Sequence, residues 1–342
     1  MKKRILMLGT GGTIASDITQ AGLAPELTPA QFLRYVPAVE RLCDVHCAEV
    51  CSIDSTNMTP AHWLKIAAAV RENYDLYDGF VICHGTDTLA YTAAALSYLI
   101  RESPKPIVVT GSQKPIHMDV TDSKTNLLDS FACACDGRLS GVMVVFGGAV
   151  ILGTRARKTY SKSFGAFGSI NYPVLGVVQE GRLIPYVRAP HTNAPLFSDA
   201  LNGRVALMKL IPGTSVRLLE FLLAENDAVI VESYGVGGVP SGGGNAFYKA
   251  IERGLARGKT VVLTTQVENE GSDLGVYNVG HSLKNDLGVL EAYDMTTEAV
   301  TAKLMWLLAR EKSAERVRAL FYTPVANDIL CAAPRYTAQK SE

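Results

Sequence analysis

Short apolar runs recur along the chain and alternate with segments of helical periodicity. The runs lie at residues 4–8 (RILML), 79–83 (GFVIC), 106–110 (PIVVT), 141–146 (GVMVVF), 228–231 (AVIV) and 260–265 (TVVLTT). Continuous apolar runs without strict alternation are typical of strands that are covered on both faces, as in a parallel sheet. Each run therefore predicts a buried strand.

Two segments between these strands begin with a recognisable helix start. In MTPAHWLKIAAAVREN (58–73), Thr59 is a candidate N-cap and Pro60 occupies the first helical position. The segment LTPAQFLRYV (27–36) repeats this Thr-Pro start. The first of the two predicted helices has one apolar face, formed by Trp63, Leu64, Ala67 and Val70.

The alternation of strands and helices predicts an open α/β sheet, whose ligand sites lie beyond the carboxyl ends of the strands. With 342 residues, 48% of them apolar, the chain can bury a large core, which we expect to be divided between two domains. Residues 185–203 are rich in Pro, Asn and small residues and show neither periodicity. We therefore predict a larger, mostly parallel α/β domain at 1–188, a linker at 189–203 and a smaller α/β domain at 204–342.

The charge pattern favours a small-molecule partner. Lys plus Arg (33) balance Asp plus Glu (33), and no basic run extends beyond the first few residues. This is not the pattern of a nucleic-acid or membrane binder. The start MKKRILMLG imitates a signal peptide, but its apolar run is shorter than the roughly seven residues that such a peptide needs. We therefore expect a cytoplasmic protein.

The seven cysteines form no C-x-x-C pair and no plausible disulfide framework, so we expect most of them to be reduced and buried. Four neighbouring residues offer metal-binding side chains, namely Cys43, His46, Cys47 and Cys51. Their spacing is not that of a zinc site, and VHCAEV alternates like a strand. We interpret the segment as a strand without a metal.

Three common catalytic or nucleotide-binding motifs are absent. The first turn, GTGGT (9–13), resembles a dinucleotide fingerprint, but Ile14 stands where the third glycine belongs. The segment ARGKT (256–260) has Arg253 where a P-loop needs glycine. No serine occupies a Gly-x-Ser-x-Gly elbow.

Threonines follow two of the predicted strands. Thr13 comes after the first strand, and Thr86, Asp87 and Thr88 lie between the strand at 79–83 and the next helix. A threonine becomes a nucleophile when a base takes its proton, and the oxyanion that forms needs donors around it. Gly11, Gly12 and Gly85 would let backbone amides supply them. Because Thr and Asp are also common helix N-caps, HGTDT alone leaves capping and catalysis open, and Thr13 alone favours a turn residue.

Taken together, these motifs resemble a known family. TGGTIAS (10–16) and HGTDTLAYTA (84–93) are similar to the two signature motifs of the bacterial-type L-asparaginases. Further similarity runs through IDSTNMTPAHW, PIVVTGSQKPI, VESYGVGGVP and MTTEAVTAKLMWLL, in the family's order, with the cytoplasmic type I form as the best match. The resemblance implies the two-domain asparaginase fold. It also implies hydrolysis of L-asparagine through an acyl-threonine, with no metal or organic cofactor, in a homodimer or homotetramer.

The resemblance also assigns roles to individual residues. Thr13 matches the threonine that attacks the side-chain amide carbon, and Thr86 matches the second threonine, with Asp87 beside it and Lys158 as its basic partner. Ser55 and Asp87 match positions that hold the α-carboxylate and α-ammonium of the substrate. Lys158 acts as a base only after losing its proton, which burial or a nearby cation such as Arg155 or Arg157 would favour. The full predicted substrate-binding set is Gly12, Ser55, Thr56, Gly85, Thr86, Asp87 and Ser112.

One position departs from the family. The loop after the first motif usually carries a tyrosine that activates the first threonine, but here Leu23 stands in the matching stretch QAGLAPEL (20–27). Tyr277 is the candidate replacement base; otherwise Thr86 and Lys158 carry more of the proton transfer. A further departure is Glu232, which stands where some type I enzymes use an arginine to bind asparagine allosterically, so we expect hyperbolic kinetics.

Two alternatives remain open at this point. One is a subunit of an amidotransferase that releases ammonia from glutamine, although that architecture usually carries an N-terminal extension before the first strand. The other is a non-catalytic relative that binds and senses an amino acid, which the departure at Leu23 would permit. The presence of Thr13, Thr86, Asp87 and Lys158 together favours an enzyme.

Overall fold

The computed structural model describes residues 2–19, 22–25, 27–188 and 194–330, and divides the chain into two compact units at residues 1–199 and 200–342. Residues 189–193 of the expected linker lie outside the described residues. Residues 194–199 belong to the first unit, where the short strand β14 (Leu196–Phe197) pairs with β6 (Ile100–Arg101). Each unit has its own sheet and its own core.

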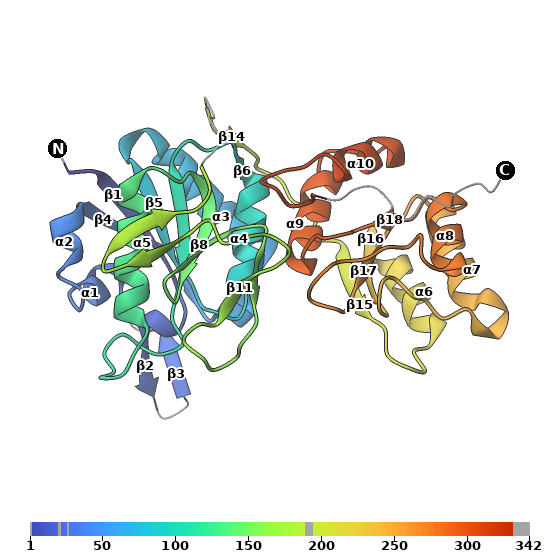
Figure 1. Ribbon diagram of the computed structural model, residues 1–342, viewed down its shortest axis with the longest axis horizontal. Helices are drawn as coiled ribbons and strands as arrows, with labels where there is room; N and C mark the ends of the chain where they lie inside the picture. Colours follow the sequence, from blue (N-terminus) through green and yellow to red (C-terminus); the bar gives the residue numbers. More distant parts are fainter. Residues whose placement is uncertain (1, 20–21, 26, 189–193, 331–342) are drawn as a thin grey trace. The chain divides into compact units, whose positions relative to one another are not determined.

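The first unit is built on an eight-stranded sheet in the order β13-β12-β9-β8-β7-β5-β1-β4 (Figure 1). Five adjacent strands are parallel: β1 (Arg4–Gly11), β4 (Asp44–Ile53), β5 (Gly79–Cys83), β7 (Pro106–Thr110) and β8 (Gly141–Phe146). The antiparallel end consists of β9 (Ala149–Leu152), β12 (Gly176–Gln179) and β13 (Arg182–Pro185). The predicted mostly parallel sheet is confirmed.

Helices cover both faces of this sheet. The helices α1 (Pro29–Leu33), α2 (Val39–Leu42) and α5 (Ser123–Asp136) pack on one face, where Phe131 of α5 shares a core cluster with Met7 and Val81 of the strands. On the opposite face, α3 (Pro60–Glu72) contacts α4 (Leu89–Leu99), which contacts β7 and β8. This double cover explains the continuous apolar runs, because both sides of each strand are buried.

Helix α3 begins as its sequence predicts. Thr59 is the N-cap, Pro60 is the first helical residue, and the His62 ring accepts from the Thr59 backbone N–H at 3.2 Å. The buried stripe differs by one position, because Ile66 is fully buried and Leu64 is only half-buried. Since successive helical residues are rotated by about 100°, Ile66 lies closer than Leu64 to the centre of the stripe.

The cysteines are free thiols within the described part of the chain. Cys43, Cys83 and Cys133 are buried, whereas Cys47, Cys51 and Cys135 are half-buried, so burial is less complete than expected. Cys331 lies outside the described residues. Cys47 and Cys51 lie on β4, as the alternation predicts, and among the described residues no group of three or more His, Cys, Asp or Glu side chains is arranged for a metal.

The second unit contains a four-stranded parallel sheet in the order β15-β16-β17-β18. Its strands are β15 (Val205–Lys209), β16 (Ala228–Ser233), β17 (Thr260–Thr265) and β18 (Leu290–Glu291). Its core includes residues of α6 (Val216–Glu225), α7 (Gly242–Ala256) and α8 (Asn278–Asn285), while α9 (Thr297–Leu308) contacts β15, β16 and α10 (Ala314–Phe321). No helix within the described ranges has the length and apolar character needed to span a membrane.

Candidate active site

Four neighbouring parallel strands of the first unit end at the same edge of the sheet. The turns that follow β1, β4, β5 and β7 carry, respectively, Thr13, Ser55, Thr86 and Ser112. Thr13 and Ser55 each begin a 3₁₀ turn, at Thr13–Ala15 and Ser55–Asn57. Residues that are far apart in the sequence are therefore collected where parallel α/β sheets bind their ligands.

Glycine allows these turns to touch through their backbones. Gly12 has φ +81°, and a Cβ at this position would lie 2.4 Å from the Cα of Gly85. A Cβ at Gly85 would in turn lie 2.6 Å from the Ser55 hydroxyl oxygen. Only glycine combines that backbone conformation with such close approaches. The glycines of the first turn thus bring the turn containing Thr13 against the other two.

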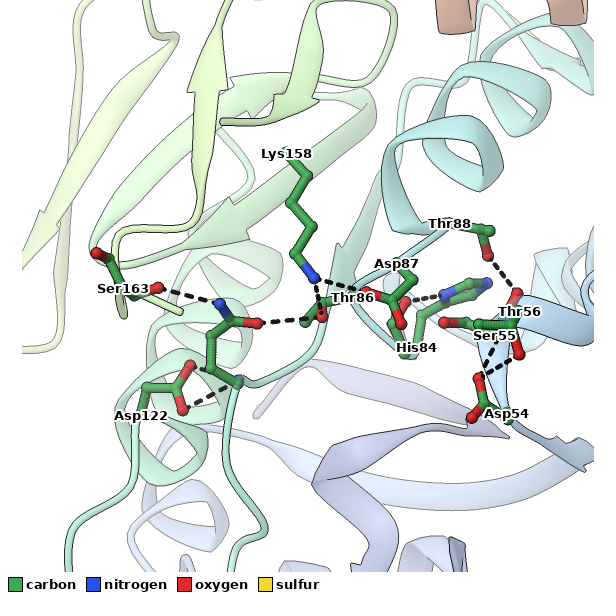
Figure 2. Close-up of polar contacts among 12 residues, drawn as sticks. Asp54, Ser55, Thr56, His84, Thr86, Asp87, Thr88, Asp122, Lys158 and Ser163 are labelled. Atoms are coloured by element: carbon green, nitrogen blue, oxygen red, sulfur yellow. Dashed lines mark hydrogen bonds and ion pairs between the residues drawn. The ribbon is translucent and has the colours of Figure 1, made fainter. Parts of the chain in front are cut away.

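The Thr86 hydroxyl is held between two side chains (Figure 2). Its oxygen accepts a hydrogen bond from the Lys158 ammonium at 2.8 Å and its proton is donated to the Gln113 side-chain oxygen at 3.2 Å. Thr86 is 5% exposed. Lys158 reaches it from β10 (Ala156–Lys158), which pairs with β11 (Phe167–Ser169). The structure therefore brings together two residues that the sequence places 72 positions apart.

Asp87 forms an ion pair with the same lysine. The distance from Lys158 Nζ to Asp87 Oδ1 is 2.7 Å. The Asp87 side chain is 58% exposed, and its second carboxylate oxygen, Oδ2, takes no part in this pair. In the ion pair Lys158 is an ammonium, which donates and does not accept. It must give up a proton before it can serve as a base.

Gln113 is a site residue that the sequence reasoning missed. Its backbone N–H and that of Lys114 donate to the buried Asp122 carboxylate at 2.9 and 3.1 Å, and its side-chain nitrogen donates to the Ser163 carbonyl at 3.3 Å. Burial raises the pKa of Asp122, and these backbone donors oppose that rise. A signal was present, because Gln113 follows Ser112 at the carboxyl end of a buried strand.

The predicted substrate-binding residues near β4 have different environments. Ser55 is 3% exposed, and its carbonyl accepts a hydrogen bond from the Thr88 hydroxyl at 2.8 Å. Thr88 occupies the N-cap position of α4 but makes no side-chain capping bond, so its hydroxyl joins two turns. Thr56 is exposed, and its hydroxyl donates to the Asp54 carboxylate at 2.9 Å.

Ser112 is fully buried beside the strand end. Its hydroxyl donates to the Lys114 carbonyl at 2.6 Å, within its own turn. This leaves the backbone of Ser112 as the part that could line a binding site. Its predicted contact with substrate through the backbone stays a prediction.

Thr13 and its candidate base, Tyr277, belong to different units. Thr13 is half-buried and is followed by a β-hairpin, β2 (Ser16–Thr19) and β3 (Gly22–Pro25), in which Leu23 is paired with Ile18. Figure 1 shows this hairpin projecting from the main sheet. Tyr277 belongs to the second unit, at the N-cap position of α8, and is 61% exposed. Its role as the base for Thr13 stays a prediction.

Known proteins share both units of this chain. The family profile described as Asparaginase, N-terminal, matches residues 4–190, and the Glutaminase/Asparaginase C-terminal domain matches residues 204–321. An L-asparaginase of Thermococcus kodakarensis is 38% identical over 95% of this chain and 99% of its own length. L-asparaginase 1 of Escherichia coli K12 is 35% identical over 93% of this chain and 95% of its own.

Comparison with solved structures gives the same result. The thermostable L-asparaginase from Thermococcus kodakarensis superposes with a TM-score of 0.90 at 37% identity, covering 96% of this chain and all of that one. A glutamyl-tRNA(Gln) amidotransferase subunit of Pyrococcus abyssi is also similar in sequence, at 32% identity over 95% of this chain and 76% of its own length. The two matched domains, their order along the chain and the described fold all agree with those of the L-asparaginases. The chain therefore belongs to the asparaginase family.

Proposed function

We propose that the protein hydrolyses the side-chain amide of L-asparagine to L-aspartate and ammonia. The observation that carries this proposal is the threonine hydroxyl of Thr86 held by Lys158, with Asp87 in the same ion pair, at the carboxyl edge of the sheet. A binding protein has no need of an ammonium that contacts a buried hydroxyl. The names of the most similar relatives support the same reaction.

In the proposed reaction the Thr13 hydroxyl oxygen attacks the amide carbon, and the Thr13 proton is taken by a base. The backbone N–H of the glycine turn at Gly85 is a candidate to stabilise the oxyanion. The expectation for Gly12 is not met, because its N–H donates to the Ile53 carbonyl at 3.1 Å. The carbon–nitrogen bond then breaks, and the nitrogen leaves as ammonia after receiving a proton. Water hydrolyses the acyl-threonine, which returns Thr13 and releases aspartate. The proposed reaction needs no metal or organic cofactor.

Recognition of the amino acid would come from two turns. Asp87 presents a carboxylate with an exposed side chain, which suits an α-ammonium group. Ser55, with the neighbouring Thr56, would hold the α-carboxylate. Neutral amides that lack the α-ammonium group would not make this contact with Asp87 and should be poor substrates.

The mechanism needs a base that takes the proton of Thr13. We propose Tyr277 as this base, and the alternative is proton transfer through Thr86 and Lys158. If Tyr277 is the base, Tyr277→Phe lowers kcat by about 10²–10⁴-fold, the usual contribution of general base catalysis. Wild-type turnover in this variant would assign the role to Lys158 and Thr86.

A second candidate function is release of ammonia from glutamine for an amidotransferase. The similarity to the Pyrococcus abyssi amidotransferase subunit supports this second candidate function. One additional methylene in a pocket changes the transition-state energy by only about 1–3 kcal/mol, so the choice between asparagine and glutamine is a matter of degree. We further propose a cytoplasmic homodimer or homotetramer, which light scattering of the purified protein would test.

The deciding experiment measures ammonia release with L-asparagine and, separately, L-glutamine. We expect turnover of asparagine that is lost in Thr13→Ala and in Thr86→Val. Thr301→Val serves as a matched control, because the Thr301 hydroxyl belongs to the second unit and donates within its own helix, to the Thr297 carbonyl at 2.8 Å. Preference for glutamine would favour the amidotransferase reaction, and binding of asparagine without turnover would overturn both enzymatic proposals. Sigmoidal kinetics would contradict the expectation drawn from Glu232.

A further inference from the structure

A buried histidine directly precedes the catalytic turn. His84 is fully buried at the end of β5, and its ring nitrogens contact two different elements. Nδ1 lies 2.7 Å from the Gly85 carbonyl oxygen, and Nε2 lies 2.8 Å from the Thr92 hydroxyl on α4. The Thr92 oxygen also accepts from the Trp63 indole N–H of α3 at 2.9 Å. Figure 2 shows the imidazole beside the turn that carries Thr86 and Asp87.

The chemistry of these groups assigns every proton along the chain. A carbonyl oxygen only accepts, so His84 Nδ1 carries a hydrogen and donates it to Gly85. The Trp63 indole only donates, so Thr92 accepts from it. The Thr92 hydroxyl is then the donor to His84 Nε2, which presents its lone pair. Burial lowers the pKa of His84 to about 4, in agreement with a neutral ring.

The hydrogen bond from His84 to the Gly85 carbonyl orients the whole peptide group between Gly85 and Thr86. The peptide between Gly85 and Thr86 is planar and trans, so its C=O and N–H point in opposite directions. Holding the Gly85 carbonyl toward the imidazole therefore directs the Thr86 N–H away from it. The same peptide precedes the Thr86 side chain that contacts Lys158, and Gly85 itself packs against Gly12 and Ser55.

We propose that His84 is a positioning residue for the reaction: as the neutral Nδ1–H tautomer, set by the Gly85 carbonyl and held at Nε2 by Thr92, it fixes the Gly85–Thr86 peptide and thereby the geometry of the catalytic turn. His84 acts through Gly85 and does not touch the substrate. The importance of the positioning for turnover rests on the proposed function. The tautomer itself does not.

The first test is spectroscopic and independent of activity. Nitrogen-15 NMR of the histidine-labelled full chain distinguishes the two neutral tautomers and the charged ring, and His84→Asn identifies the signal. We expect the neutral Nδ1–H form between pH 6 and pH 8. A neutral Nε2–H form or a charged ring in this range would overturn the proposal, whether or not the protein hydrolyses asparagine.

The second test uses two amides that replace different halves of the ring. An asparagine at position 84 places its amide nitrogen near the Nδ1 position and can still donate to Gly85. A glutamine reaches the Nε2 position and keeps only the contact with Thr92. We expect His84→Gln to lower kcat/KM by about 100-fold, the loss typical of a displaced catalytic group, and His84→Asn to stay within about fivefold of wild type.

Replacements at Thr92 test the chain from its other end. Thr92→Val removes the donor to His84 Nε2 and should lower kcat/KM and shift the Nε2 resonance, whereas Thr92→Ser keeps the hydroxyl and should restore both. The Nδ1–H tautomer should persist in each variant, because the Gly85 carbonyl still accepts from Nδ1. Ser97→Ala is the matched control, since Ser97 is also buried on α4 but bonds within its own helix, to the Ala93 carbonyl at 2.8 Å. Equal losses of kcat/KM in His84→Asn and His84→Gln would overturn the positioning role and leave His84 as a purely structural residue.

Discussion

Two lysine–aspartate pairs, one in each unit, have the same length and opposite surroundings. Lys158 and Asp87 are 2.7 Å apart, and their side chains are 20% and 58% exposed. Lys303 and Asp328 are also 2.7 Å apart, but both side chains are fully buried. The third partner differs too: Lys158 donates to the Thr86 hydroxyl at 2.8 Å, whereas Lys303 donates to the Thr323 carbonyl at 2.9 Å.

The comparison shows that the nitrogen–oxygen distance alone does not identify an ion pair that takes part in catalysis. Lys303 lies on α9 and contacts Asp328 and Thr323 in the segment that follows α10. Both contacts connect two parts of the fold to each other. Burial lowers the pKa of Lys303, and the charge of Asp328 opposes this effect. Lys158 instead meets a hydroxyl that can exchange a proton and a carboxylate that water can reach. The Lys158–Asp87 pair is therefore suited to proton transfer, and the Lys303–Asp328 pair to stabilising the fold.

The largest expected effect is on turnover at the exposed pair. Lys158→Met removes the proton-transfer partner of Thr86 and should lower kcat by about 10³–10⁴-fold. The free energy of unfolding should change by less than about 1 kcal/mol, because the Asp87 side chain is largely solvated. Steady-state kinetics and urea denaturation measure the two quantities. Lys162→Met, at a neighbouring exposed lysine, should change neither quantity appreciably.

The next effect is on stability at the buried pair. Lys303→Met leaves the Asp328 carboxylate buried without its counter-charge and should lower the free energy of unfolding by about 3–5 kcal/mol. The remaining folded protein should keep its kcat, since Lys303 is outside the proposed site. Lys312→Met is the exposed control on the same unit.

A double replacement sharpens this result. Lys303→Met with Asp328→Leu removes both charges and should recover most of the lost stability, because the cost lies in burying one unpaired charge. If the double variant is as unstable as the single one, the pair itself stabilises the unit and the interpretation of Lys303 is wrong.

The smallest of these effects concerns a buried group that stays uncharged. The pKa of His84 falls from its ordinary 6.5 to about 4 in the folded protein. Between these values the unfolded chain binds more protons than the folded one, so stability rises with pH and is lost as pH falls from about 6.5 to 4. The expected loss is about 3 kcal/mol.

Chemical denaturation at a series of pH values measures this loss, with His84→Asn as the comparison. The variant lacks the titrating ring and should show a flatter dependence in this window. An identical slope in both proteins would place the acid sensitivity on another group. Asp129 cannot be that group, since burial raises its pKa to about 6 and makes its contribution to stability fall as pH rises, so it opposes the effect of His84 equally in both proteins.

Much of the fold could be predicted from local patterns. The strands at β1, β5, β7, β8, β16 and β17 follow from their apolar runs, and α3 follows from Thr59 and Pro60. The end of the first unit could not be located in this way. Strand β14 is two residues long, and its pairing partner Ile100–Arg101 lies almost a hundred positions earlier, so no local periodicity marks it.

The sequence by itself determined the family, the two α/β units and the threonines that follow the strands, because these depend on motifs and on local periodicity. The resemblance also predicted Lys158 as the partner of Thr86, but only the tertiary structure decided that Gln113 accepts a hydrogen bond from Thr86 and that Thr88 bonds to Ser55. Those contacts depend on which strands are neighbours in the sheet and on how closely glycine lets their turns approach. Neither property can be deduced from the spacing of residues within a single segment.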